Sequence, residues 1–477
     1  MSRTFFEHLR FIVTCDSEDR VIEDGALVVE GSRILDVGRT AKVMSRLQPT
    51  PEDTVIDGST LGVTPGFVDT HVHLSETLSR AAFPDRLDTR AWVFQWVMPY
   101  YGELTPEDEV IAVKMAVSEM LRAGTTCFLD MGALNDPRLT VPVLAELGIR
   151  GITGRHAADV KPDPIPDGWS QRMVDKHFFP STDAALEELE ACVHELDGFA
   201  EGRIRCWVNI QGKEPCSAEL HVGARRLSER LGVGTTYHIA STAKEAELIE
   251  RKHGATPVTR MERLGALGSN LVLAHAVAVS QEEVAILARR GCKVAFCPGT
   301  SLKLAKGATA IGRYPEMLDA GIRVGLGTDG VSAAGNLNLM RQMYLVAGLF
   351  KDARRDPSKI GASRALRMAT IDGAAALGLQ DQIGSLEAGK RADLVVFDLD
   401  HPEWVPHHDP VQALVWSATA ASISQTWVDG VPVYSDGRVH TISDEAALRK
   451  EVRNRAEALI QRAGLHADGP VTTGAYE

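Results

Sequence analysis

Short apolar runs rich in β-branched residues alternate with amphipathic stretches of helical spacing between about residue 60 and about residue 340. This alternation is typical of parallel strands that are joined by crossover helices. Eight runs fit as strands, and each is followed by a helical or loop segment, so the pattern predicts a closed (β/α)8 TIM barrel of the α/β class. After a first run that ends at His73, the expected strands are 125–130, 150–155, 204–210, 234–238, 271–275, 293–297 and 324–329.

Two of the connecting helices carry starting signals. Pro106 and the acidic residues that follow it suit a first helical turn, and Gly124 marks the end of that helix. Ser280 with Glu283 forms a capping-box sequence, which predicts a second helix that runs to Gly291. Both signals support the barrel and say nothing about function.

A second group of short strands is divided between the two ends of the chain. Residues 10–14 and 25–31 have strand patterns near the start, and 392–397, 424–430 and 431–434 have them near the end. Neither set has enough strands to cover a core, so we expect one small β-sandwich domain built from both termini. The expected domains are 1–61 and 379–440 for the two parts of the sandwich, 62–378 for the barrel, and 441–477 for a C-terminal helix and tail.

Composition narrows the class of partner. The chain has 477 residues, 44% of them hydrophobic and 24% charged, with a formal net charge of -13. Nucleic acid and anionic membranes attract clustered Lys and Arg, so we expect a small-molecule substrate, no nucleic acid and no membrane partner. No long apolar segment is present, and the seven cysteines form no Cys-x-x-Cys pair, which favours a cytoplasmic enzyme with reduced thiols.

Candidate chemistry gathers at the ends of the predicted strands. His71 and His73 are two positions apart, so in a strand they point to the same side. His238, His275 and Asp329 close the fifth, sixth and eighth strands, and barrel enzymes place reactive groups at these ends. Taken singly, either histidine suits a core position and the aspartate suits an Asx-turn, but their joint placement favours one divalent metal ion, Zn²⁺ or Fe²⁺.

The order of these residues resembles the amidohydrolase superfamily, in its cytosine deaminase-like, triazine hydrolase and S-adenosylhomocysteine deaminase branch. The resemblance implies metal ligation by His71, His73, His238 and Asp329, contact of His275 with the hydrolytic water or substrate, and a homodimer. A divalent ion lowers the pKa of its water to about 7, and we expect Asp329 to accept the proton as the water attacks a trigonal carbon. The similar stretches cover nearly the whole chain and include 64–74, 123–126, 273–275, 297–298, 302–304, 325–330 and 383–394.

One departure from this family bears on the reaction. Related deaminases carry a glutamate three residues after the strand-five histidine, where this chain has Ser241. A serine hydroxyl cannot hold a labile proton near neutral pH, so ring deamination is disfavoured. We therefore expect hydrolysis of a urea, carbamate or amide of an aromatic or alkylated compound. The alternative is an aminohydrolase or chlorohydrolase-like enzyme acting on a purine, pyrimidine, pterin or s-triazine ring.

Other departures lie near the ends of strands four and seven. Gln211 stands where S-adenosylhomocysteine deaminase-like sequences tend to have histidine, and Ser301 stands where the family usually has asparagine. We expect Gln211, Ser241 and Glu214 to bind substrate, with Glu214 either a replacement proton shuttle or a solvated loop charge. A carboxylated Lys213 of a binuclear site is disfavoured, because the resemblance is to mononuclear enzymes. A non-catalytic scaffold remains a third interpretation, against which the intact ligand set argues.

Overall fold

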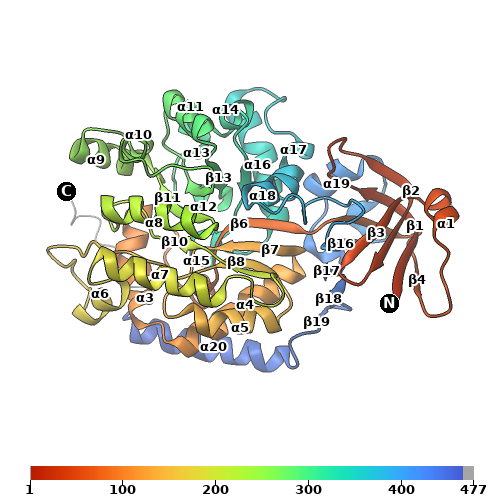
Figure 1. Cartoon of the computed structure of the whole chain (residues 1–477), viewed down its shortest axis with the longest axis horizontal. Helices are drawn as coiled ribbons and strands as arrows, with labels where there is room; N and C mark the ends of the chain where they lie inside the picture. Colours follow the sequence, from red (N-terminus) through yellow and green to blue (C-terminus); the bar gives the residue numbers. More distant parts are fainter. Residues whose placement is uncertain (1, 466–477) are drawn as a thin grey trace.

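Eight parallel strands close into a barrel in the computed structural model, which describes residues 2–465 (Figure 1). Hydrogen bonds connect the strands in the orders β15-β6-β7-β8-β9 and β10-β11-β12-β13-β14. Only Trp207 separates β9 from β10, and two residues separate β14 from β15, so each of these pairs counts as one of the eight barrel strands. The chain itself therefore closes the ring, and the predicted barrel is confirmed. The strands are β6 Phe67–His73, β7 Thr125–Asp130, β8 Arg150–Thr153, β9 Ile204–Cys206, β10 Val208–Asn209, β11 Thr235–Ile239, β12 Leu271–His275, β13 Lys293–Phe296, β14 Val324–Leu326 and β15 Asp329–Gly330.

The helices of the barrel begin where the sequence signals place them. Helix α4 starts at Pro106, and α11 starts after Ser280, whose hydroxyl accepts the backbone N–H of Glu283 at 3.2 Å. The Glu283 carboxylate accepts the Ser280 N–H at 3.0 Å in return, which completes the capping box. The helices around the barrel include α4 Pro106–Arg122, α5 Pro137–Glu146, α7 Thr182–Leu196, α8 Ala218–Leu231, α9 Ala243–His253, α10 Pro257–Leu264, α11 Gln281–Arg290, α14 Tyr314–Asp319, α16 Leu339–Arg354, α17 Ala362–Met368 and α18 Ile371–Ala376.

Shorter helical segments follow several strands and surround the C-terminal end of the barrel. The sequence patterns did not predict them, since each is only one or two turns long and its conformation depends on the surrounding barrel. They are η1 Leu74–Ser79, α2 Thr89–Ala91, η2 Trp92–Val97, α3 Met98–Glu103, α6 Gln171–His177, α12 Pro298–Lys303, α13 Ala308–Ile311 and α15 Val331–Ala334.

The predicted small β domain from both termini is confirmed, and its strands belong to one mixed sheet. Strand β5 Leu61–Pro65, of which all but Leu61 lies on the barrel side of the expected division, pairs within the small sheet, with β1 Arg3–Val13 on one side and with β16 Leu394–Asp398 on the other. Figure 1 shows the red N-terminal and blue C-terminal strands together at the right of the molecule. The remaining strands are β2 Val21–Glu30, β3 Arg33–Arg39, β4 Thr54–Asp57, β17 Ile423–Val428, β18 Val431–Ser435 and β19 Arg438–Val439.

This sheet curls around a core of its own, as a sandwich does. The rings of Phe6 in β1 and Trp427 in β17 have centroids 5.4 Å apart, although β5 and β16 lie between their strands. Three strand spacings would separate these strands by ~14 Å in a flat sheet. The curl therefore brings the inner faces of the two halves into contact and buries both rings.

Charged contacts join the barrel to its surroundings. Arg150 of β8 donates to Asp393 at 2.8 Å and to Asp429 at 2.5 Å, which connects the barrel to the small sheet. Helix α20 Glu445–Arg462 confirms the expected C-terminal helix, and its Arg455 donates to Asp108 of α4 at 3.0 Å. The expected tail after it lies mostly at 466–477, outside the described residues.

Two expectations about the chain as a whole can be compared with the structure. All seven cysteines lie within the described residues, and all are buried and unpaired. Within residues 2–465, no helix combines the length and apolar character that crossing a membrane requires. The candidate catalytic residues lie on the barrel.

Candidate metal centre and active-site cavity

The five residues predicted to carry the chemistry meet at the C-terminal end of the barrel. His71 and His73 belong to β6, His238 to β11 and His275 to β12, and Asp329 begins β15. The Asp329 Oδ1 atom lies 3.5 Å from Nε2 of His71 and 3.5 Å from Nε2 of His73. The Nε2 atoms of His73 and His238 are 3.3 Å apart. Side chains separated by up to 258 positions thus surround one point.

The backbone is unusual where two of these side chains leave their strands. His275 has a φ of 73° and Asp329 a φ of 62°, which is the left-handed region that residues other than glycine rarely adopt. Such conformations cost of order 1–3 kcal/mol each and cluster at functional sites. Buried Asp69 helps to hold this geometry, since its carboxylate accepts the N–H of His71 at 3.1 Å and the hydroxyl of Thr328 at 2.6 Å.

The donor set fits a divalent metal ion. His71 is fully buried, and neither of its ring nitrogens has a hydrogen-bond partner among the described residues. A buried polar group without a partner is costly, whereas a cation would satisfy it. Candidate ligand atoms of His71, His238 and His275 lie within 4.8 Å of one another, as do those of His71, Cys297 and Asp329. Imidazole and carboxylate ligands of this kind suit zinc.

The residues around the histidines fix their orientation. Nδ1 of His238 lies 2.8 Å from the carbonyl oxygen of Gln211, so Nδ1 carries the hydrogen and Nε2 is left for the centre. One carboxylate oxygen of Glu76 lies 3.8 Å from Nδ1 of His73. The other oxygen accepts a hydrogen bond from the hydroxyl of Ser332 at 2.7 Å. Sequence reasoning missed Glu76, although its place three residues after His73 was a usable signal.

Burial sets the charge of the site. Burial lowers the pKa of His73, and lowers the pKa of His238 and His275 well below the usual histidine value. Burial alone would raise the pKa of Asp329, but the neighbouring side chains of His71, His275 and Lys306 keep that pKa well below its usual range. Neutral imidazole and ionised carboxylate are the forms in which histidine and aspartate bind metals.

A cavity of about 800 Å³ opens directly onto this centre, and His73, His238, His275 and Asp329 form part of its wall. Much of the remaining wall is apolar, and it includes the aromatic rings of Trp92, Phe94 and Tyr101. Cavities of this size and character bind small organic molecules, and aromatic side chains favour planar rings. The larger apolar side chains of the wall are Trp92, Val93, Phe94, Val97, Met98, Leu248, Leu304 and Ile311.

Lys306 was missed by sequence reasoning and lies beside the reaction centre. Its side chain is 3% exposed, and Nζ is 3.2 Å from Nε2 of His275 and 3.9 Å from Oδ2 of Asp329. Burial lowers the pKa of Lys306 to about 8. The residue belongs to the irregular loop between α12 and α13, where no pattern in the sequence marked it.

His156 was also missed, at the opposite side of the histidine cluster. It is 4% exposed and lines the cavity, and neither ring nitrogen has a hydrogen-bond partner within residues 2–465. Burial lowers its pKa well below the usual value. A signal existed, because His156 directly follows the third predicted strand and strand ends carry the chemistry of barrels.

Gln211 and Glu214 both line the cavity, where the sequence placed them. The side-chain oxygen of Gln211 accepts a hydrogen bond from Nε2 of His177 at 2.7 Å. The Glu214 carboxylate is bound by Lys252 and by Nε2 of His253, the latter at 2.9 Å. These contacts turn Glu214 toward the outer rim, and substrate contact by either residue stays a prediction.

Ser241 is fully buried and does not belong to the cavity wall. Its hydroxyl has no hydrogen-bond partner in the described part of the chain. The wall is formed instead by the residues after it, including Glu245, whose Oε2 lies 2.8 Å from Nζ of Lys213. Ser301 has a structural contact, because its hydroxyl accepts a hydrogen bond from the backbone N–H of Ala308 at 3.2 Å.

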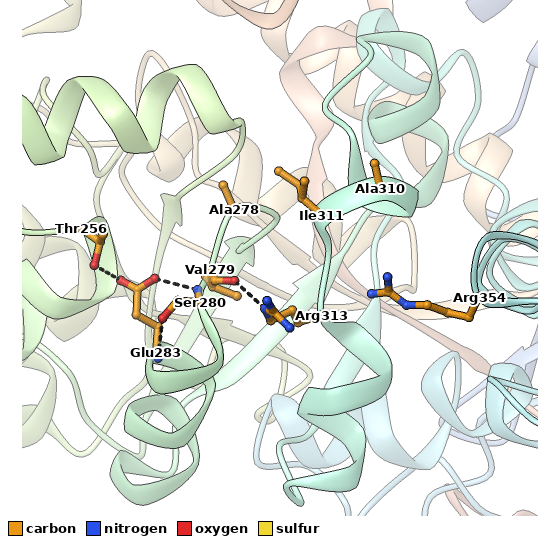
Figure 2. Close-up of a pocket in the computed structure, with 9 residues that line it drawn as sticks. All are labelled: Thr256, Ala278, Val279, Ser280, Glu283, Ala310, Ile311, Arg313 and Arg354. Carbon is orange, nitrogen blue, oxygen red and sulfur yellow. Dashed lines mark hydrogen bonds between the residues drawn. The ribbon is translucent and has the colours of Figure 1, made fainter.

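A smaller hollow of about 400 Å³ shares Ile311 with the large cavity (Figure 2). The Glu283 carboxylate there bonds to Thr256 at 2.6 Å, and Nε of Arg313 donates to the carbonyl of Val279 at 3.2 Å. These bonds brace the loop before α11, and the hollow contains none of the residues of the metal centre. We therefore place the chemistry in the larger cavity.

Comparison with known proteins agrees with this geometry. A 5-methylthioadenosine/S-adenosylhomocysteine deaminase of Desulforamulus reducens is 31% identical over 449 residues, which cover 94% of this chain and 97% of that protein. The crystal structure of a zinc-bound adenosine deaminase from Xanthomonas campestris superposes with a TM-score of 0.84 at 26% identity, over 96% of this chain and 99% of the other. A triazine hydrolase from Arthobacter aurescens shares the fold, with a TM-score of 0.84 at 24% identity over 96% and 100% of the two chains.

The profile of the Amidohydrolase family matches residues 63–433, which include the whole barrel and most of the C-terminal strands. The chain is thus a hydrolase of carbon–nitrogen bonds other than peptide bonds, built around a divalent metal site. With the matched profile, the eight-stranded barrel and the histidine-aspartate centre in agreement, this chain belongs to the amidohydrolase family.

Proposed function

We propose that this amidohydrolase is an aminohydrolase, which releases ammonia from an amino group on a nitrogen heteroaromatic ring of the adenine type. The observation that carries the proposal is the cavity, in which a wall with Trp92, Phe94 and Met98 accompanies the metal centre and suits a planar ring. Relatives named as deaminases over nearly the full chain support the same reaction. We therefore favour the aminohydrolase alternative over the hydrolysis of a urea, carbamate or amide, which Ser241 suggested.

The catalytic residues follow from the geometry. His71, His73, His238 and Asp329 would hold the metal ion, and we propose Zn²⁺ because of the histidine-rich ligand set and the zinc-bound relative. When bound, the ion would make a water acidic enough to attack near neutral pH. Asp329 accepts one proton of that water and transfers it to the amino nitrogen, which leaves as ammonia. His275 is placed to hydrogen-bond the attacking oxygen.

A substrate panel tests the proposal. Enzyme reconstituted with zinc is assayed for ammonia release from adenosine, 5-methylthioadenosine, guanine, cytosine and an amino-s-triazine, and for amine release from a phenylurea, a phenylcarbamate and an anilide. Ammonia from a ring amine is expected. Amine release from the second group, without ammonia from the first, would overturn the proposal and favour a urea or amide hydrolase. Light scattering of the same preparation tests the expected homodimer.

A further inference from the structure

The carboxylate of Glu245 occupies the space beside position 241. Glu245 is the third residue of α9, and its N–H donates to the hydroxyl of the capping residue Thr242 at 3.2 Å. Its Oε1 atom accepts the backbone N–H of Ser241 at 3.3 Å. A glutamate four residues further along the chain therefore reaches back to the backbone of the position at which related deaminases carry their glutamate, and it lines the cavity.

Lys213 holds this carboxylate from the neighbouring strand. Lys213 lies in the loop after β10, and its Nζ is 2.8 Å from Oε2 of Glu245. The two side chains are 21% and 18% exposed, and both line the cavity that opens onto the metal centre. Lys213 has a φ of 62°, an unfavourable backbone conformation that persists only where the surroundings enforce it. The pair therefore links the ends of the fourth and fifth barrel strands across the cavity wall.

The other carboxylates on the cavity wall make different contacts. Asp329 belongs to the metal centre, and Glu76 lies behind His73. Glu214 is turned toward its partners at the rim, and the Asp88 side chain is 55% exposed and caps α2. Among the described residues, Glu214 and Glu245 are then the partly buried carboxylates of the wall outside the metal centre, and Glu245 is the less exposed of the two, at 18% against 30%.

We propose that Glu245 is the acid–base residue that moves a proton to the substrate ring, and that Lys213 is its positioning residue. This inference rests on the proposed aminohydrolase function. Glu245 accepts one proton of the attacking water while the new carbon–oxygen bond forms and the carbon–nitrogen π electrons move to the ring nitrogen. Glu245 then gives that proton to the ring nitrogen. The remaining hydroxyl proton passes through Asp329 to the amino group, the carbon–nitrogen bond breaks, and ammonia and a ring carbonyl result.

The test uses the zinc-loaded, full-length enzyme with 5-methylthioadenosine as the probe. E245Q should lower kcat/KM by at least about 100-fold, the smallest effect typical of a lost acid–base group, with zinc content and melting temperature unchanged. E247Q, the same substitution on an exposed residue of the same helix, is the matched control and should stay within threefold of wild type.

Lys213 is tested by a readout that a purely structural residue would not change. K213M should lower kcat more than it raises KM and should displace the acidic limb of the pH profile, and K213R should restore both. An E245Q enzyme that retains zinc and stays within fivefold of wild type would overturn this inference alone. A wild-type enzyme that deaminates neither this probe nor any other ring amine would overturn the proposed function itself, before any variant is compared.

Discussion

Replacing Lys306 with methionine should strengthen metal binding at the predicted centre. The ammonium of Lys306 lies 3.9 Å from Oδ2 of Asp329, so it competes with a cation for the same carboxylate. Two unit charges at this distance interact by about 4 kcal/mol at an effective dielectric constant of 20. Because burial already lowers the pKa of Lys306 to about 8, part of that attraction only offsets the cost of the buried charge. We expect about 1–2 kcal/mol to appear in the affinity, which is roughly tenfold tighter zinc binding.

The assay is a competition for zinc between the metal-free enzyme and a chromophoric chelator, for wild type and K306M. K303M is the matched control, since Nζ of Lys303 donates to the carbonyl of Ser332 at 2.7 Å and the residue does not line the cavity. The sign of the pH dependence follows from the pKa of about 8. Lys306 is charged below that pH and neutral above it, so the affinity gap between wild type and K306M should be full at pH 6.5 and close by pH 9.5. An unchanged or weaker zinc affinity in K306M at pH 6.5 would refute the reasoning.

Three further predictions concern the metal centre and its support. D329A should lose turnover and most zinc binding while its melting temperature stays near that of wild type, and an active D329A enzyme would exclude Asp329 as the base. R150M should lower the free energy of unfolding by about 3–5 kcal/mol in urea titrations, because Asp393 stays buried without its cation; a loss below about 1 kcal/mol would contradict this. Chelation should abolish activity, and comparing readdition of Zn²⁺ with Fe²⁺ identifies the metal that restores it.

The barrel was predictable because its signal is local and repeated. The run 125–130 matches β7 in full and 271–275 matches β12 in full, since each is a short run with apolar residues and one polar residue at its end. Once the strands are placed, the rule that barrel chemistry sits at their C-terminal ends brings His71 and Asp329 together from opposite ends of the barrel sequence. The small sheet was predictable only as two incomplete sets of strands, and the pairing of β5 with β16 that joins them is a long-range contact.

Two of the residues that sequence reasoning missed, Lys306 and Glu76, lie in a loop and in a short helical segment, where no periodicity indicates which way a side chain points. Lys306 and Glu76 face the centre because α12, α13 and η1 fold back over the barrel, and those short elements carry no pattern of their own. The prediction for Ser241 shows the same limit. Ala240, directly before it, has a φ of 46°, so the chain turns in the left-handed region and the period-two alternation of the strand stops there.

The turn at Ala240 changes what the sequence at position 241 means. The residue three positions after His238 is expected to face the substrate only if the chain continues straight beyond the strand. On that assumption, the serine at this position disfavoured ring deamination. In the folded chain, Ser241 is buried and Glu245 places its carboxylate 3.3 Å from the Ser241 N–H, on the wall of the cavity. A proton can be transferred by any carboxylate that reaches the substrate, whatever its position in the sequence. The reaction type therefore depends on which group reaches the substrate, and we propose that Glu245 is that group.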